Sequence, residues 1–180
     1  MTDLVAVRER GQILRFGFDD ALRYAGPGSP AGVAIGFKAL QHAFEVLSPD
    51  APPERRAITV RTAFRGPGAR DAFEAVTRAV TDGRFTVDRR LLRADRGRLL
   101  EDFVFEIGVG GPAVTLLLRD GFVTDEFIDL ARTERRSQDQ ERQLDSLKAI
   151  LAQHVLSSDA TEVFADGERA VEVLGEHLTD

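Results

Sequence analysis

The chain has 180 residues, a length that suits one domain, and its 30 acidic and 24 basic residues give a net charge of −6. It contains no cysteine, which excludes disulfides, thiol catalysis, zinc ribbons and iron–sulfur clusters. The first 15 residues are charged and no stretch approaches the ~20 apolar residues of a spanning helix, so we expect a cytoplasmic protein with no membrane partner.

Charge is distributed unevenly along the chain. Residues 54–98 contain 12 arginines and 6 acids, whereas residues 120–180 contain 15 acids and 6 bases. The acidic total argues against nucleic acid as a partner. The basic middle is either an ordinary solvated face, an anion site or the contact of a self-complementary dimer.

The first third of the chain predicts two helical segments. Residues 13–24 indicate a short strand or turn and then a helix, with Asp19 or Asp20 as its capping residue. Pro30 suits the first turn of the next helix, because its missing N–H has no partner there in any case. Apolar residues then recur at steps of three and four, as in an amphipathic helix: Val33, Phe37, Leu40, Phe44 and Leu47.

The middle third predicts a strand, a helix and three strands. Residues 56–64 alternate and are rich in β-branched side chains, which is typical of a strand, and residues 69–80 have helical periodicity. Three candidate strands follow, at 85–91, 103–109 and 113–119, the last two joined by the hairpin signal Gly110-Gly111. This order predicts an α+β fold in which two helices pack on a four-stranded mixed sheet.

The last third predicts a C-terminal helical arm. Residues 123–135 and 137–156 have helical patterns, and Asp159 with Glu162 three residues later forms a capping-box pattern for a last short helix. We therefore divide the chain into an α+β domain, residues 1–135, and a helical extension, residues 136–180. The extension either packs on its own domain or reaches a second copy of the chain, and we expect a homodimer.

Two glycine- and proline-rich loops, residues 26–32 and 65–71, each open a helix. The first N–H groups of a helix have no internal partners and carry a partial positive charge, so they attract an anion. Neither loop fits the phosphate-loop or the dinucleotide-binding spacing. Tight turns into a helix also need glycine for structural reasons alone, and the sequence leaves both interpretations open.

Several segments around these loops resemble the FmdE family, named for a component of formylmethanofuran dehydrogenase. They are Gly32-Val33-Ala34-Ile35-Gly36-Phe37-Lys38, Asp71-Ala72-Phe73-Glu74-Ala75-Val76-Thr77 and Gly83-Arg84-Phe85, and the similarity covers roughly residues 18–130. The resemblance implies the order helix, strand, helix and three strands. It also implies a metal pocket at the two loops, with a His-x-His and a cysteine at the first and another cysteine at the second.

The metal ligands of that family are missing here. Gly26, Gly28 and Ser29 or Pro30 stand at the positions of the first loop, and Gly68 or its neighbours at that of the second. Glycines supply no imidazole, thiolate or carboxylate to a metal. The cysteine-rich C-terminal zinc finger is missing as well, so we expect a degenerate metal site with no metal and no other cofactor.

Residues beside the loops could bind an anion in place of the cation. Arginine side chains and backbone N–H groups together suit a carboxylate or phosphate. Arg70 and Asp71 could equally satisfy each other at the start of the second helix. The predicted ligand site comprises Tyr24, Gly26, Gly28, Ser29, Gly32, Arg65, Gly66, Gly68, Arg70 and Asp71.

Catalytic signals are weak, and the catalytic residues stay unknown. The three histidines, His42, His154 and His177, lie on separate helical segments, and we expect His42 to pack in the core. No serine stands in a Gly-x-Ser-x-Gly motif and no facing pair of carboxylates is visible. The sequence favours a non-catalytic binding or accessory protein that holds a small anionic ligand between the loops. The alternatives are a metal-independent enzyme using Tyr24, Arg65 and Asp71, and a structural dimerisation partner.

Overall fold

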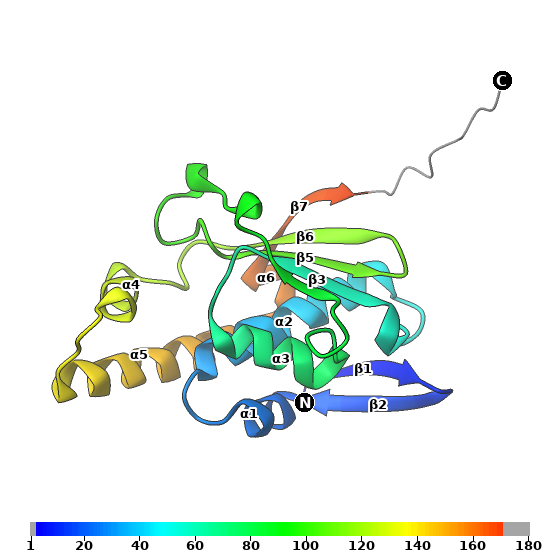
Figure 1. The fold of residues 1–180 in the computed structure, drawn as a ribbon, viewed down its shortest axis with the longest axis horizontal. Coiled ribbons are helices and arrows are strands. Elements are labelled where there is room, and N and C mark those ends of the chain that lie inside the picture. Colours follow the sequence, from blue (N-terminus) through cyan, green and yellow to red (C-terminus); the bar gives the residue numbers. More distant parts are fainter. Residues whose placement is uncertain (1–2, 171–180) are drawn as a thin grey trace.

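The computed structural model describes residues 3–170, and these form an α+β fold around a five-stranded mixed sheet (Figure 1). The strand order is β4-β3-β5-β6-β7. The pair β3–β4 is parallel and the other three pairs are antiparallel. The strands are β3 (Ile58–Thr62), β4 (Phe85–Val87), β5 (Val104–Val109), β6 (Ala113–Leu118) and β7 (Phe164–Ala170).

The helices and a separate hairpin build two further layers on one face of this sheet (Figure 1). Nearest the sheet lie α2 (Pro30–Leu47) and α3 (Pro67–Thr77), and below them lie α1 (Phe18–Ala25) and the antiparallel hairpin of β1 (Leu4–Glu9) and β2 (Gln12–Gly17). Three short 3-10 turns, Arg55–Ala57, Arg89–Leu91 and Ala94–Arg96, lie in the connections. No helix within residues 3–170 has both the length and the apolar character needed to cross a membrane.

The α+β class and the order from α2 to β6 are confirmed, and two strands were missed. The hairpin strand β1 and the edge strand β7 were not predicted, and β7 adds a fifth strand to the expected four. The segment of β7, Phe-Ala-Asp-Gly-Glu-Arg-Ala, lacks a run of alternating apolar residues. It becomes a strand because it pairs with the exposed edge of β6, a contact that its own sequence does not encode.

Capping explains where several helices begin. The N-cap of α1 is Gly17, not Asp19 or Asp20 as expected, since both acids lie in the first turn, where Asp20 accepts a hydrogen bond from the Gly17 N–H at 2.8 Å. The capping box before α6 (Ala160–Val163) is confirmed, since the Asp159 N–H donates to Glu162 Oε2 at 3.2 Å. Each such bond satisfies a backbone donor that the helix itself leaves unpaired.

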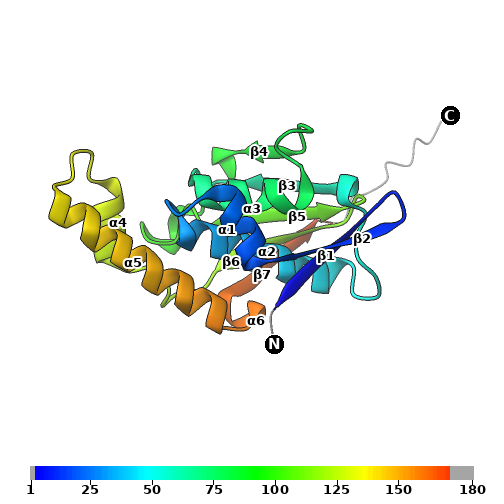
Figure 2. The same cartoon turned by 90° about the horizontal axis from the view of Figure 1, so that it is seen from below.

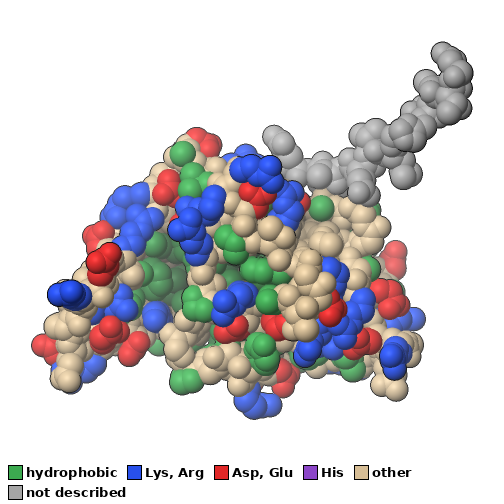
Figure 3. Space-filling model, viewed as in Figure 1, with side chains coloured by type: hydrophobic (Ala, Val, Ile, Leu, Met, Phe, Trp, Pro, Cys, Tyr) green, Lys and Arg blue, Asp and Glu red, His purple; other side chains and the backbone are tan. Residues whose placement is uncertain are grey.

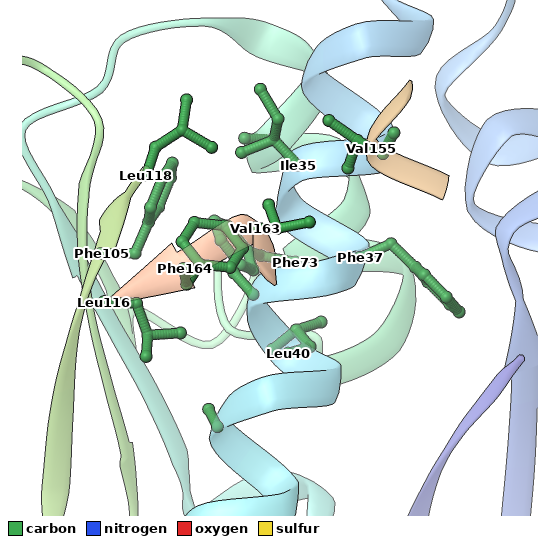
Figure 4. Packing of buried hydrophobic residues seen from close by; sticks show 14 of the residues in the cluster. Ile35, Phe37, Leu40, Phe73, Phe105, Leu116, Leu118, Val155, Val163 and Phe164 are labelled. Atoms are coloured by element: carbon green, nitrogen blue, oxygen red, sulfur yellow. The ribbon is translucent and has the colours of Figure 1, made fainter. Parts of the chain in front are cut away.

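The core is built around α2, which is buried on nearly all sides. Figure 4 shows Ile35 and Leu40 of α2 on the side that faces Leu116 and Phe105 of the sheet. All four side chains have at most 1% of their surface exposed. Burial of a large apolar side chain contributes about 1.5–3 kcal/mol, so this layer supplies much of the folding free energy.

Two polar side chains of α2 are buried with this core. Lys38 is 2% exposed and its Nζ lies 3.2 Å from Asp3 Oδ2, and His42 is 5% exposed with its Nε2 2.5 Å from Asp166 Oδ1. The expected packing of His42 is thus confirmed. Buried polar groups need partners, and these two connect α2 to residues near each end of the described chain. His177 lies outside the described residues.

Helices α2 and α3 cross so closely that glycine is required at the contact. A Cβ on Gly36 would lie 3.0 Å from Ala69 Cα, and a Cβ on Gly68 would lie 2.6 Å from the carbonyl oxygen of Ser29. Real Cβ atoms essentially never come closer than 3.0 Å to backbone, so the Gly68 position excludes a side chain, whereas at Gly36 the neighbouring atoms would have to shift by a few tenths of an ångström. The crossing therefore depends on the missing side chains, and it brings the first turns of both helices together.

Replacing Gly68 tests this crossing. Glycine to alanine within a helix normally stabilises a protein by about 0.4–1 kcal/mol, because alanine loses less conformational entropy on folding. Here the added methyl group would meet backbone, so we expect Gly68→Ala to lower the free energy of unfolding by about 1–3 kcal/mol in urea titrations.

Gly28→Ala is the matched control, because a Cβ there meets nothing within 4 Å and Gly28 has no positive φ. It should change stability by less than about 0.5 kcal/mol. A Gly68→Ala variant as stable as the Gly28→Ala variant would contradict the requirement for glycine.

Candidate functional site

A pocket of about 430 Å³ lies where the two glycine-rich loops meet the C-terminal helical arm. Figure 3 shows it as a hollow with a hydrophobic interior, flanked by basic side chains, between the arm and the body of the molecule. Its lining comes from the starts of α2 and α3, the connection before β5, and the helices α4 (Asp125–Arg132) and α5 (Gln138–Ser157). The volume falls within the range of small-molecule sites.

The close crossing of α2 and α3 places both loops at this pocket. A Cβ on Gly32 would lie 3.1 Å from Gly68 Cα and 3.1 Å from the Ala69 nitrogen. Gly32 belongs to the first turn of α2 and Gly68 to that of α3, so the two helices begin side by side. The glycines that suggested a ligand site are thus also the residues that let the helices touch.

The far wall of the pocket is the arm formed by α4 and α5. Leu151 and Val155, near the end of α5, are buried, and this part of the helix packs on α2 of the same chain. The first half of α5 extends past the sheet and carries α4 with it (Figure 2). Leu144 from this half is 2% exposed and lines the pocket.

Two arginines hold the arm in place. Arg136 donates to the carbonyl oxygens of Leu130 at 3.1 Å and Thr133 at 2.9 Å, and its Nε lies 2.9 Å from Glu141 Oε1. A cation at the C-terminal end of α4 is favourable there because the helix carbonyls concentrate negative potential. Arg136 therefore joins α4 to α5.

Arg98 joins the arm to the body of the protein. It pairs with Asp125 and with Asp129, the latter at 3.0 Å, and both acids belong to α4. These hydrogen bonds, with Asp125 as the larger cause, raise the pKa of the Arg98 guanidinium above its ordinary value. Arg98 is half-exposed, so this pair orients α4 more than it stabilises the fold.

The rim of the pocket is strongly basic. Its lining includes one acid, Asp102, which lies 2.9 Å from Arg89, and five cations: Arg65, Arg98, Arg132, Arg136 and Lys148. Arg98 and Arg136 are engaged as described, and Arg132 Nη2 lies 4.0 Å from Glu101 and donates to the Arg98 carbonyl at 3.4 Å.

Two of these cations have no acidic partner within residues 3–170. Arg65 makes no hydrogen bond or ion pair with any residue in that range, and Lys148 Nζ donates to a single acceptor, the Gly28 carbonyl oxygen, at 3.0 Å. Arg65 stands on the second loop and Lys148 on α5. The pocket thus presents two uncompensated positive charges from its two sides.

The structure brings five of the ten predicted site residues to the pocket lining: Ser29, Gly32, Arg65, Gly66 and Gly68. The other five lie outside it. Tyr24 is 57% exposed, and Arg70 lies 3.5 Å from Asp71, which matches the alternative in which the two satisfy each other. Gly26 ends α1 with a φ of 83°, a backbone conformation that favours glycine, and Gly28 reaches the site only through its carbonyl bond to Lys148.

The sequence did not predict Phe64, which directly precedes the second loop, or the lining residues from later segments, among them Arg98, Phe103, Phe127 and Lys148. One signal was available for Lys148. The chain has only two lysines among its 24 basic residues, and Lys148 lies four residues after Leu144 and three before Leu151, on the apolar stripe of its helix. A lysine at such a position faces the interior or a partner.

The residues at the loops do not fit a metal ion. Within the part of the chain that the structure describes, no three His, Asp or Glu side chains come together in a way that could hold one. His42 lies on the side of α2 that meets β7, and His154 stacks on Phe122 at 4.4 Å, so neither lines the pocket.

No protein-family model matches the chain, and no curated protein matches it in sequence. The resemblance to the FmdE family therefore stays a hypothesis.

Arg136→Ala tests how the arm is held. Loss of the bonds to the α4 carbonyls should destabilise the arm locally by about 1–2 kcal/mol, so amides of α4 and of the first half of α5 should exchange roughly tenfold faster. Hydrogen–deuterium exchange read by mass spectrometry measures this. Amides of β5 should keep their protection.

Arg142→Ala is the control, because among the described residues 3–170 the Arg142 side chain pairs only with Asp139, on the exposed side of α5. It should leave exchange in α4 unchanged. Equal effects of the two substitutions would show that Arg136 does not hold the arm.

Proposed function

We propose that this protein is a non-catalytic binding protein that holds a small anionic ligand in the pocket between the two loops and the arm. The observation that carries the proposal is the pair Arg65 and Lys148, two cations that have no acidic partner within residues 3–170 and line one concave site. Positive charge without a partner at the edge of an apolar cavity favours an anion.

The two cations suit a carboxylate or phosphate in different ways. The planar guanidinium of Arg65 can donate two parallel hydrogen bonds, and the ammonium of Lys148 acts as a point charge. Hydrogen bonds between charged partners contribute about 1.5–3 kcal/mol each, which corresponds to roughly 10- to 100-fold in affinity. An oxyanion held between loop and arm would also bridge these two parts of the protein.

The proposal extends to the origin of the site. We propose that the chain is a metal-free relative of the FmdE family, in which side-chain cations serve at the loops where that family holds a metal. The helix, strand, helix and three-strand order of α2 to β6 supports this, as does the meeting of the two loops at one pocket. The homodimer stays a prediction.

The alternative of a metal-independent enzyme has less support. It requires Tyr24, Arg65 and Asp71 in one cleft, and Arg65 alone of the three lines the pocket. Asp71 is engaged with Arg70 instead.

Two substitutions in the pocket test the proposal. Wild type is titrated calorimetrically with inorganic phosphate, acetate, benzoate and octanoate, and the tightest of these probes is then titrated into each variant. Arg65→Ala and Lys148→Met should each weaken that probe by roughly tenfold or more, because each removes a charged hydrogen-bond donor.

Arg70→Ala is the matched control, since Arg70 is an exposed arginine of the same loop that lies outside the pocket. It should leave the affinity unchanged. The proposal fails if none of the four anions binds, or if the Arg70 variant weakens binding as much as the Arg65 variant.

A further inference from the structure

The interior of the pocket is aromatic as well as apolar. Phe64, Phe103 and Phe127 all line it: Phe64 directly precedes the second loop, Phe103 directly precedes β5, and Phe127 belongs to α4. Phe103 is 4% exposed, whereas Phe64 and Phe127 are only partly buried. Two rings therefore keep free surface that a ligand can cover.

The ring of Phe64 contacts both the ring of Phe103 and the backbone of the second loop. It stacks on Phe103 with ring centroids 4.7 Å apart and planes at 28°. It also lies so close to Gly66 that a Cβ there would overlap the edge of the ring. A glycine at this position of the loop lets the ring fold over the backbone, and the stacked pair is part of the pocket lining.

Two cations line the same pocket as these rings. Arg65 follows Phe64 directly in the chain, and Lys148 approaches from α5, one helical turn after Leu144. Leu144 itself lines the pocket and is 2% exposed. The site thus combines aromatic and apolar side chains with two cations.

This combination selects among anions. Inorganic phosphate or acetate would use the cations but leave the apolar surface in water, and a neutral aromatic compound would leave the cations unused. A flat ring offset-stacks on another ring with a gain of about 0.5–1.5 kcal/mol beyond simple burial, which a flexible acyl chain does not obtain.

We infer that the ligand is an aryl carboxylate, with its ring against Phe64 and Phe127 and its carboxylate toward Arg65 and Lys148. The inference rests on the proposed function, since it names the chemical class of the anion bound at the same site. Binding needs no covalent step and no cofactor.

Four probes differing in one property each test the inference by calorimetry on the wild-type protein. They are 2-naphthoate, its neutral amide 2-naphthamide, the aliphatic carboxylate octanoate, and acetate, which has no apolar body. We expect 2-naphthoate to bind most tightly, with the amide roughly tenfold weaker or more, because it lacks the charge. Octanoate should be weaker by roughly 3- to 10-fold and acetate by more.

The outcomes separate this inference from the proposed function. Octanoate or acetate binding as tightly as 2-naphthoate would overturn the aryl class, and dependence of that binding on Arg65 and Lys148 would leave the anion site intact. Naphthamide binding as tightly as naphthoate would overturn the role of the carboxylate. If all four fail to bind, the inference is rejected, and phosphate binding that depends on Arg65 would still support the proposed function.

Phe64→Leu gives a second test, because it keeps an apolar side chain and removes the ring. We expect this variant to lose roughly 3- to 10-fold in affinity for 2-naphthoate and to bind octanoate as wild type does. Phe122→Leu is the control, since Phe122 stacks on His154 and does not line the pocket. Equal losses for both ligands in Phe64→Leu would show general damage to the pocket and contradict a stacking role.

Discussion

The close crossing of α2 and α3 is the contact on which the rest of the structure depends. Gly32 and Gly36 on one helix meet Gly68 and Ala69 on the other, and a Cβ on Gly68 would lie only 2.6 Å from the Ser29 carbonyl oxygen. Because α2 is also the helix that packs on the sheet and on α5, its position fixes the whole core. The same contact sets the two glycine-rich loops next to each other at one pocket.

This constraint links the stability of the fold to the chemistry of the site. Glycines at the crossing supply no ligand side chains, so the pocket takes its chemical character from its neighbours: Arg65 and Phe64 beside the second loop, Lys148 on the arm. The arm is held by Arg98, which forms ion pairs with acids of α4, and by Arg136, which donates hydrogen bonds to carbonyl oxygens at the end of α4. Arg65 and Lys148 have no acidic partner within residues 3–170.

Much of the fold could be predicted from local sequence, and the strands that were missed have a common cause. The periodicity of Val33, Phe37 and Leu40 predicts α2 because burial on one face imposes a 3.6-residue repeat. Strand β7 carries no such repeat, and it forms only because β6 offers an open edge far away in the sequence. Local patterns reveal amphipathic elements, whereas edge pairing depends on a tertiary arrangement that composition does not encode.

The candidate site shows the same division. Both loops could be found from their glycines, and half of the predicted residues line the pocket. Tyr24 was included because it precedes the first loop, yet it lies at an exposed position at the end of α1. Lys148 was missed because it approaches from a helix more than a hundred residues later in the chain, where it bonds to the Gly28 carbonyl.

The most direct test of the account is an NMR titration of ¹⁵N-labelled protein with 2-naphthoate. We expect amide shifts to change at Gly32, Gly66 and Gly68 and on the facing side of α5 around Leu144. A second hollow of about 420 Å³, lined by Asp3 and Lys38, lies away from these loops. Shift changes confined to that hollow, with the three glycine amides unmoved, would contradict the claim that the helix crossing builds the ligand site.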